Sequence, residues 1–188
     1  MVKINYSIVA AVGVAILVIA AIGFVVYGNA FGKPAESTEK SGMTITDMAG
    51  RTVTLNAPVE RIVLTESSKT AELAAIAGDG FAEKIVGWDS DIKRNAGDVY
   101  AVFVAKYPQL ADIPDVGWLD DGTFSIEKVI SLKPDVVIMH NFQFMWAGDA
   151  TADALTKLEL AGIPVVFVDF YMDPMVNSTK SMLLLGKI

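Results

Sequence analysis

Hydroxyl and acidic side chains gather in the segment "TESS", Thr65 to Ser68, between an apolar run and a helical pattern. A serine between a strand and a helix is the position of the nucleophile in many hydrolases. The sharp turn of those enzymes needs glycines, as Gly-x-Ser-x-Gly, and this segment has none. Serines that cap the helix beginning at Thr70 are the simpler interpretation. Serine hydrolysis at Ser67 or Ser68 is therefore kept only as a remote alternative.

His140 is the single histidine of the sequence, and the chain has no cysteine. Zinc and iron sites usually take three or four protein ligands, so scattered carboxylates beside one histidine do not suffice. We predict no catalytic residue, no resident metal site and no cofactor. His140, Asp169 and Tyr171 are expected at the same edge of a sheet, so direct contact with iron in a bound ligand stays open. A hydrogen-bonded histidine at that edge is the simpler interpretation.

Aromatic residues give the strongest signal for a binding site. The segment "NFQFMW", Asn141 to Trp146, reads as a loop that follows an apolar strand. Trp88, Trp118 and Tyr171 follow, or end, other predicted strands. Aromatic side chains outside regular elements are suited to line a site for a bulky, partly apolar ligand. The alternative, that they fold back over the sheet edge, stays open.

Apolar strands alternate with amphipathic helices behind these residues. Continuous apolar runs such as "VVIM" and "VVFV" are typical of strands covered on both faces, so the pattern predicts a doubly wound, parallel α/β sheet. A short strand "IPDVG" and an antiparallel hairpin in "MTITDMAGRTVTL" complete it. The expected strands are 61–64, 85–88, 136–139 and 165–169, and the expected helices are 70–77, 99–107, 149–161, 176–185 and one beginning at 126.

Ligands of such sheets bind beyond the carboxyl ends of the strands. Loop residues at those ends are therefore the predicted ligand contacts. They are Thr65, Glu66, Ser67, Trp88, Trp118, His140, Phe142 and Tyr171.

The first 33 residues differ from the rest, because 20 consecutive residues from Ile8 to Tyr27 are apolar or glycine. That length predicts a transmembrane helix, with a signal segment cleaved near Ala30 as the alternative. Residues 34–42 read as a polar linker. Without cysteine, these residues offer no site for a lipid anchor on a thiol. The net charge of −7, with no basic stripe, argues against nucleic acid as a partner.

Several segments of residues 43–188 occur in an order that is similar to the substrate-binding proteins of iron–siderophore, haem and cobalamin importers. They are "TITDMAGRTVTLNAPVERIVL", "TAELAAIAG", "KIVGWDS", "IPDVGW", "SIEKVISLKPDVVI" and "LAGIPVVFVD". The resemblance implies two α/β lobes joined by a long helix, with a metal chelate held between them. It also implies docking on an ABC permease with its ATPase, and no enzymatic activity.

From this resemblance, residues 43–174 are expected to form the amino-terminal lobe, and 175–188 to begin the connecting helix, with the second lobe absent. Glu127 in "SIEK" is expected to dock on the permease; plain stabilisation of the helix start is the alternative. The expected ligand is an iron chelate, siderophore or haem, or cobalamin, captured outside the cell membrane or in the periplasm. A strongly anionic catecholate would favour several arginines, and only Arg94 is near. A membrane-tethered interaction module that binds no ligand is the alternative function.

Overall fold

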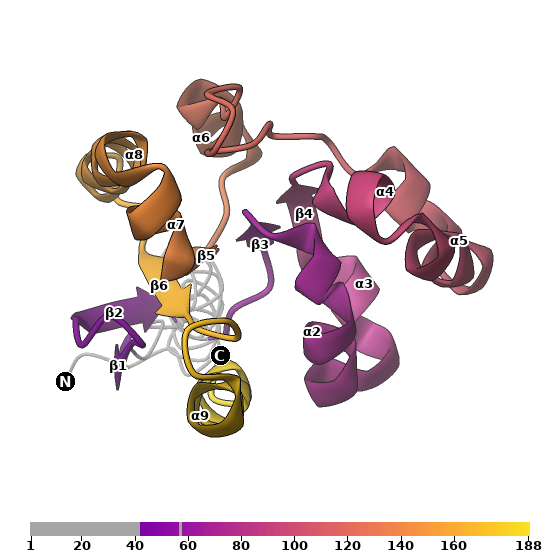
Figure 1. Cartoon of the computed structure of the whole chain (residues 1–188), viewed down its shortest axis with the longest axis horizontal. Helices are drawn as coiled ribbons and strands as arrows, with labels where there is room; N and C mark the ends of the chain where they lie inside the picture. The colour runs from indigo at the N-terminus through magenta and orange to yellow at the C-terminus, as the bar shows by residue number, and fades with distance from the viewer. Residues whose placement is uncertain (1–41, 57) are drawn as a thin grey trace, which may run out of the picture. The chain divides into compact units, whose positions relative to one another are not determined.

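The computed structural model describes residues 42–56 and 58–188. Four parallel strands form its central sheet in the order β4-β3-β5-β6 (Figure 1). Every residue of β5 and β6 is buried, as expected for strands with both faces covered. The strands are β3 (Ile62–Leu64), β4 (Ile85–Trp88), β5 (Val136–His140) and β6 (Val165–Val168).

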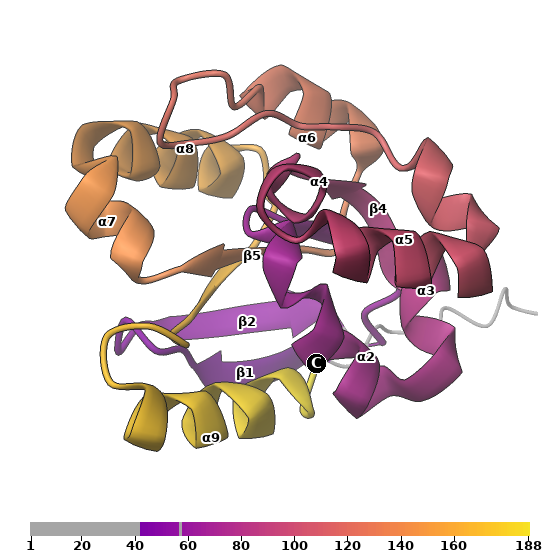
Figure 2. The same ribbon diagram turned by 45° about the vertical axis from the view of Figure 1, so that its right-hand side comes forward.

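Helices cover both faces of this sheet. Helices α2 (Thr70–Ala77) and α9 (Pro174–Leu185) pack on the face that presents Ile138, and α6 (Ile126–Leu132) and α8 (Gly148–Leu160) pack on the face that presents Val137 (Figures 1 and 2). Neighbouring residues of one strand thus belong to two separate core clusters, because side chains alternate across a sheet. The predicted α/β sheet with helices on both faces is confirmed.

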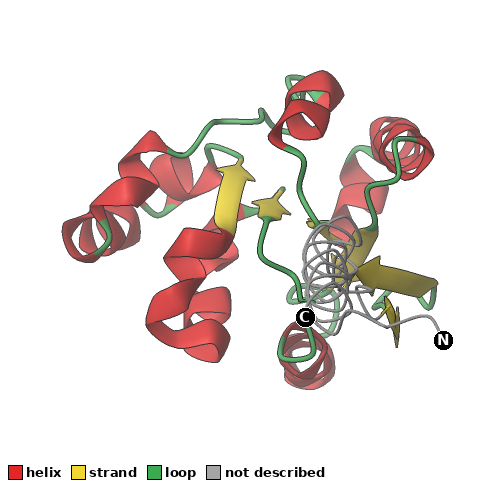
Figure 3. Cartoon of the chain, turned by 180° about the vertical axis from the view of Figure 1, so that it is seen from behind, coloured by secondary structure: helices red, strands yellow, loops and turns green. Residues whose placement is uncertain are grey.

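Shorter elements complete the domain and surround the strands (Figure 3). The hairpin of β1 (Gly42–Thr46) and β2 (Thr52–Asn56) lies beside β6, where the Met48 N–H donates to the Phe167 carbonyl at 2.9 Å. This contact covers the outer edge of the sheet. The remaining elements are η1 (Ser67–Lys69), η2 (Gly78–Gly80), α3 (Phe81–Lys84), α4 (Asp91–Asn95), α5 (Gly97–Lys106), η3 (Pro108–Asp112) and α7 (Phe142–Trp146).

Local sequence explains where these elements begin and end. The Ser125 hydroxyl accepts from the Lys128 N–H at 3.2 Å and caps the start of α6. Lys133, the residue that follows the last residue of α6, adopts the left-handed conformation (φ 48°) and ends the helix. Pro174 begins α9, where its missing N–H leaves no partner unsatisfied. Gly87 lets α6 lie directly on β4, because a Cβ there would lie 2.6 Å from Leu132 Cδ1.

Segments that follow β4 and β5 differ from the sequence prediction. "IPDVG" forms only one isolated parallel bridge, between Trp88 and Asp115, rather than a strand. "NFQFMW" forms the short helix α7 instead of a loop, and Asp91–Asn95 forms α4. The Asp89 carboxylate accepts from the Asp91 N–H at the start of α4, and the Gln143 amide oxygen accepts from the His140 N–H just before α7. These bonds tighten the turns that lead into the two helices.

The predicted membrane anchor or signal segment (1–33) and most of the polar linker lie outside the described residues, while Gly42 begins β1. Across residues 42–56 and 58–188, no helix combines the length and apolar character that a membrane crossing requires.

Candidate functional site

The two central strands, β3 and β5, lie side by side, and the chain leaves them in opposite directions across the sheet. After β3 it passes through α2 to β4, and after β5 it passes through α8 to β6. The carboxyl ends of such neighbouring strands diverge and leave a crevice where ligands of open α/β sheets bind. Thr65 and His140 mark these two ends.

Gln143 joins the ends of β3 and β5. Its Oε1 accepts from the Thr65 hydroxyl at 2.7 Å and from the His140 N–H at 3.0 Å, and its Nε2 donates to the Thr65 carbonyl at 3.0 Å. All three residues are buried. Sequence reasoning missed Gln143; the signal available was one amide within an otherwise aromatic segment.

Ser67 joins the ends of β3 and β4. Its hydroxyl donates to the Asp89 carbonyl and accepts from the Ile92 N–H, both at 2.9 Å, while its own N–H donates to Asp89 Oδ1. The expectation that Ser67 or Ser68 caps α2 is wrong, because no side chain caps that helix. Ser67 instead holds the start of α4 against β3, and its buried hydroxyl is fully engaged as donor and acceptor.

Asp169 fixes the loop after β6. Its Oδ1 accepts from the N–H groups of Tyr171 and Met172, and its Oδ2 accepts from Asn177 on α9 at 2.7 Å. The Ser181 hydroxyl bonds the Asp169 backbone at both its N–H and its carbonyl. The aromatic residue Tyr171 is therefore presented from a loop with little freedom.

A pocket of about 480 Å³ lies above these joined strand ends, within the size range of small-molecule sites. We call it the rim pocket. Four predicted ligand contacts line it: Glu66, Trp118, Phe142 and Tyr171. Its other lining residues are Asp120, Met145, Trp146 and Met172. Trp146 is 77% exposed and Met145 67%, so a large apolar surface faces the pocket opening.

Glu66 is the buried polar residue of the rim pocket. Its Oε1 accepts from Tyr171 Oη and from Ser68 Oγ, each at 3.0 Å, whereas its buried Oε2 has no partner in the described structure. Burial, followed by the charges of Asp91 and Asp89, raises the pKa of Glu66 to about 8. Perturbed carboxyls in concave sites are a mark of functional positions.

His140 lies beneath the rim pocket rather than on its surface. It is buried among the rings of Phe142, Phe170 and Tyr171, at centroid distances of 5.6–5.8 Å, and its Nδ1 has no partner among the described residues. Burial and nearby Lys69 lower the pKa of His140 to about 3, so the ring is neutral. We predicted that His140 would lie at the ligand-contacting edge of the sheet, and the structure corrects this, because the surrounding aromatic rings shield the imidazole.

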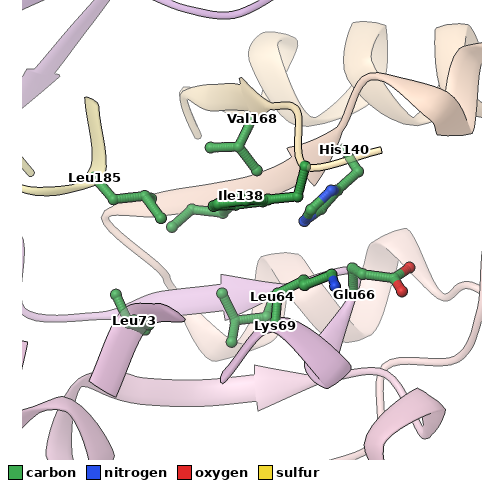
Figure 4. Close-up of a pocket in the computed structure, with 9 residues that line it drawn as sticks. Leu64, Glu66, Lys69, Leu73, Ile138, His140, Val168 and Leu185 are labelled. Carbon is green, nitrogen blue, oxygen red and sulfur yellow. The ribbon is translucent and has the colours of Figure 1, made fainter. Parts of the chain in front are cut away.

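A cavity of about 10 Å³, the size of one water, adjoins His140. Figure 4 shows His140 and Glu66 at one end of this cavity and Leu73 and Leu185 at the other. The cavity is too small for a ligand.

Trp88, Thr65 and Ser67 were also predicted to contact ligand, and the structure places all three inside the protein. Trp88 has no exposed surface, and its ring meets Tyr100 of α5 edge-on at 6.2 Å. The prediction that these three residues contact ligand at the sheet edge is therefore corrected. Thr65 and Ser67 position the loops by hydrogen bonds, and Trp88 contributes to the core.

Two cations stand near the pocket, each with partners already. Lys69 Nζ lies 4.5 Å from the centre of the Tyr171 ring and 3.7 Å from Glu72. The Arg94 guanidinium lies 5.0 Å from the centre of the Trp118 ring and 3.5 Å from Asp121. Within residues 42–56 and 58–188, no three histidine or acidic side chains converge as a metal site would require.

A sequence profile described as "Periplasmic binding protein" matches residues 62–180. The chain belongs to the periplasmic binding protein family. The members of this family bind solutes and are not enzymes, as the sequence led us to expect. The serine hydrolase alternative is thereby set aside, in keeping with the buried, engaged hydroxyl of Ser67.

Individual relatives agree with this membership. The chain is 31% identical over 137 residues to the uncharacterised ABC transporter substrate-binding lipoprotein YvrC of Bacillus subtilis. It is 34% identical to the TroA-like periplasmic binding protein FepB of Veillonella parvula, with a TM-score of 0.70 over 77% of this chain. It is 26% identical to the molybdate periplasmic binding protein MolA of Haemophilus influenzae, with a TM-score of 0.54 over 77% of this chain.

The chain spans well under half of each of these relatives: 37% of the lipoprotein, 42% of FepB and 38% of MolA. The described domain therefore corresponds to one part of a longer binding protein in each comparison. Glu127, the predicted docking residue, lies exposed in the first turn of α6.

Proposed function

We propose that this chain is the solute-binding component of an ABC importer, which captures a metal chelate outside the membrane and delivers it to the permease. The chelate is an iron siderophore, haem or a corrinoid such as cobalamin. The rim pocket is the observation that carries this proposal, because it lies beyond the diverging ends of the central strands, where ligands of open α/β sheets bind. Its aromatic lining suits a bulky, largely apolar cargo.

The way the site is built supports capture rather than chemistry. Gln143, Ser67 and Asp169 fix the four strand ends by buried hydrogen bonds, so the aromatic walls are in place before a ligand arrives. The serine hydroxyl that resembled a nucleophile is used inside this framework. A rigid, largely apolar pocket with two carboxyls at its wall is suited to bind and orient a cargo and to leave it unchanged.

Tryptophan fluorescence tests the proposal, because Trp118 and Trp146 line the pocket while Trp88 is buried. Titration of the full chain with a ferric trihydroxamate, haem and cobalamin is expected to quench emission saturably with at least one probe. Trp146→Ala should weaken that binding by about tenfold, since loss of one large ring contact is worth about 1–2 kcal/mol. Val102→Ala, an exposed apolar truncation on α5, is the matched control and should change nothing.

Absence of saturable quenching with all three probes would contradict ligand capture by this chain. If such a chain still associated with the permease in a pull-down, the result would favour the alternative of a tethered interaction module.

A further inference from the structure

We propose that Met145 and Met172 are oxidation sites, and that conversion of their thioethers to sulfoxides lowers the affinity of the rim pocket for its ligand. This inference rests on the proposed function, since it takes the rim pocket as the binding site, and it adds a chemical control of that site. Both methionines line the pocket, and they are 67% and 52% exposed. An oxidant dissolved in water can therefore reach both side chains.

The sulfur atoms of the chain are all thioethers. The sequence contains eight methionines and no cysteine, so no thiolate of this chain competes for a two-electron oxidant. Met145, Met172 and Met175 are the exposed methionines of the described residues, and Met175, at 91%, does not line the pocket. The other described methionines are buried or packed against the core: Met43, Met48, Met139 and Met182. Burial thus directs an oxidant to the pocket and to one site outside it.

The backbone holds both side chains at the pocket. Met172 follows β6, and its N–H donates to Asp169 Oδ1 at 2.9 Å. Met145 belongs to α7, the short helix that Gln143 fastens to the ends of β3 and β5. Aromatic rings and these two methionines form the apolar part of the pocket lining. A thioether is polarisable and makes favourable contacts with aromatic rings, so the reduced side chains extend the apolar wall.

A two-electron oxidant such as hydrogen peroxide changes the character of this wall. The thioether sulfur attacks one peroxide oxygen, so that an S–O bond forms and the O–O bond breaks. The sulfur loses two electrons, and the peroxide is reduced to water. Each sulfoxide adds a polar hydrogen-bond acceptor to the wall. A largely apolar ligand would have to strip water from these acceptors without offering them a donor, and its binding is thereby weakened.

The modification is reversible and suits the proposed location. Methionine sulfoxide reductases, with one enzyme for each sulfoxide epimer, restore the thioether at the expense of a dithiol. A binding protein outside the membrane works in an oxidising compartment. Oxidation of Met145 and Met172 would therefore reduce capture while an oxidant is present, and reduction would restore it.

Calorimetry of the full chain tests the inference with the ferric trihydroxamate, haem and cobalamin probes. The chain is treated with hydrogen peroxide, desalted and titrated beside an untreated sample. Peptide mass spectrometry is expected to find an added oxygen on Met145, Met172 and Met175 and none on buried Met139. The dissociation constant of each probe that binds the untreated chain should rise by about tenfold, and the two reductases with a dithiol should restore it.

Two leucine variants assign the effect to the pocket, each compared with its own untreated sample. The double variant Met145→Leu with Met172→Leu keeps apolar side chains of similar volume and removes both sulfurs, so peroxide should no longer raise its dissociation constant. Met175→Leu removes the exposed sulfur outside the pocket and should stay as sensitive to peroxide as the wild type.

Unmodified Met145 and Met172, or sulfoxides there without weaker binding, would overturn the inference while leaving the proposed function standing. A double variant as sensitive to peroxide as the wild type would also overturn it, because the effect would then arise at another residue. Failure of all three probes to bind the untreated chain would contradict the proposed function together with the inference.

Discussion

At the scale of single residues, burial shifts the pKa values of Glu66 and His140 so that both side chains favour their uncharged forms. Glu66 is a buried acid close to the carboxyls of Asp89 and Asp91. It accepts hydrogen bonds from Ser68 and Tyr171. Lys69 and His140 line the small cavity beside it. The pKa of Glu66 is raised from 4.5 to about 8, so the folded protein binds a proton that the unfolded chain has released above pH 4.5. The contribution of Glu66 to the free energy of unfolding is fully present below pH 4.5 and is lost as the pH rises through about 8.

Glu66→Gln should therefore stabilise the protein selectively at high pH. The free energy of unfolding, measured in urea, should exceed the wild-type value by about 1–3 kcal/mol at pH 8.5 and differ little at pH 4.5, because the amide never ionises. His140, whose lowered pKa makes stability fall below pH 6.5, contributes equally to both proteins and cancels in the difference. Glu83→Gln serves as the exposed control. An unchanged pH dependence in Glu66→Gln would show that this carboxyl is not buried as described.

At the scale of elements, apolar periodicity was enough to predict β5, β6 and α8, because burial on both faces dictates continuous apolar strands. Apolar periodicity did not predict which side chains at the strand ends are exposed and which are buried. Trp88 is the last residue of β4, and whether its ring meets solvent or core depends on how the later helix α5 packs against it. Likewise α7 forms because Gln143 bonds two strand ends brought together only by the fold. The eight expected contacts thus include four that line the rim pocket and four that lie beneath it or in the core.

The turn that carries Trp118 and Asp120 depends on Gly117. Its φ is +81°, and a Cβ there would lie 2.1 Å from the Thr123 carbonyl oxygen. Gly117→Ala should lower the free energy of unfolding by about 2–4 kcal/mol, because backbone strain and a backbone collision add. Gly122→Ala, at φ +74° with nothing within 4 Å, carries the strain alone and should lose only about 1 kcal/mol. Equal losses in urea unfolding would contradict the described turn.

At the scale of the whole molecule, the chain corresponds to less than half of each solute-binding relative compared above. Trp146 and Met172, which line the rim pocket, are exposed. We propose that ligand capture and permease docking use separate surfaces, since Glu127 on α6 does not line the rim pocket. A change at one surface should leave the other unaffected.

Glu127→Ala tests this separation. The exposed carboxylate is expected to pair with arginines of the permease, so its loss should weaken association with the permease by about tenfold or more, with unchanged stability and unchanged chelate binding. Glu83→Ala is the control for loss of an exposed acid elsewhere. Permease affinity equal to the wild type, measured by surface plasmon resonance in detergent or nanodiscs, would show that the docking assignment is wrong.

Hydrogen exchange of the full chain with and without a saturating ferric trihydroxamate tests the central claim most directly. The account predicts added protection in the segments that form the rim pocket, 65–69, 118–122, 141–146 and 170–173, and none at the groove between β2 and the end of α8. Protection confined to that groove, or absent from all four rim segments despite measured binding, would contradict the claim that these strand ends hold the ligand.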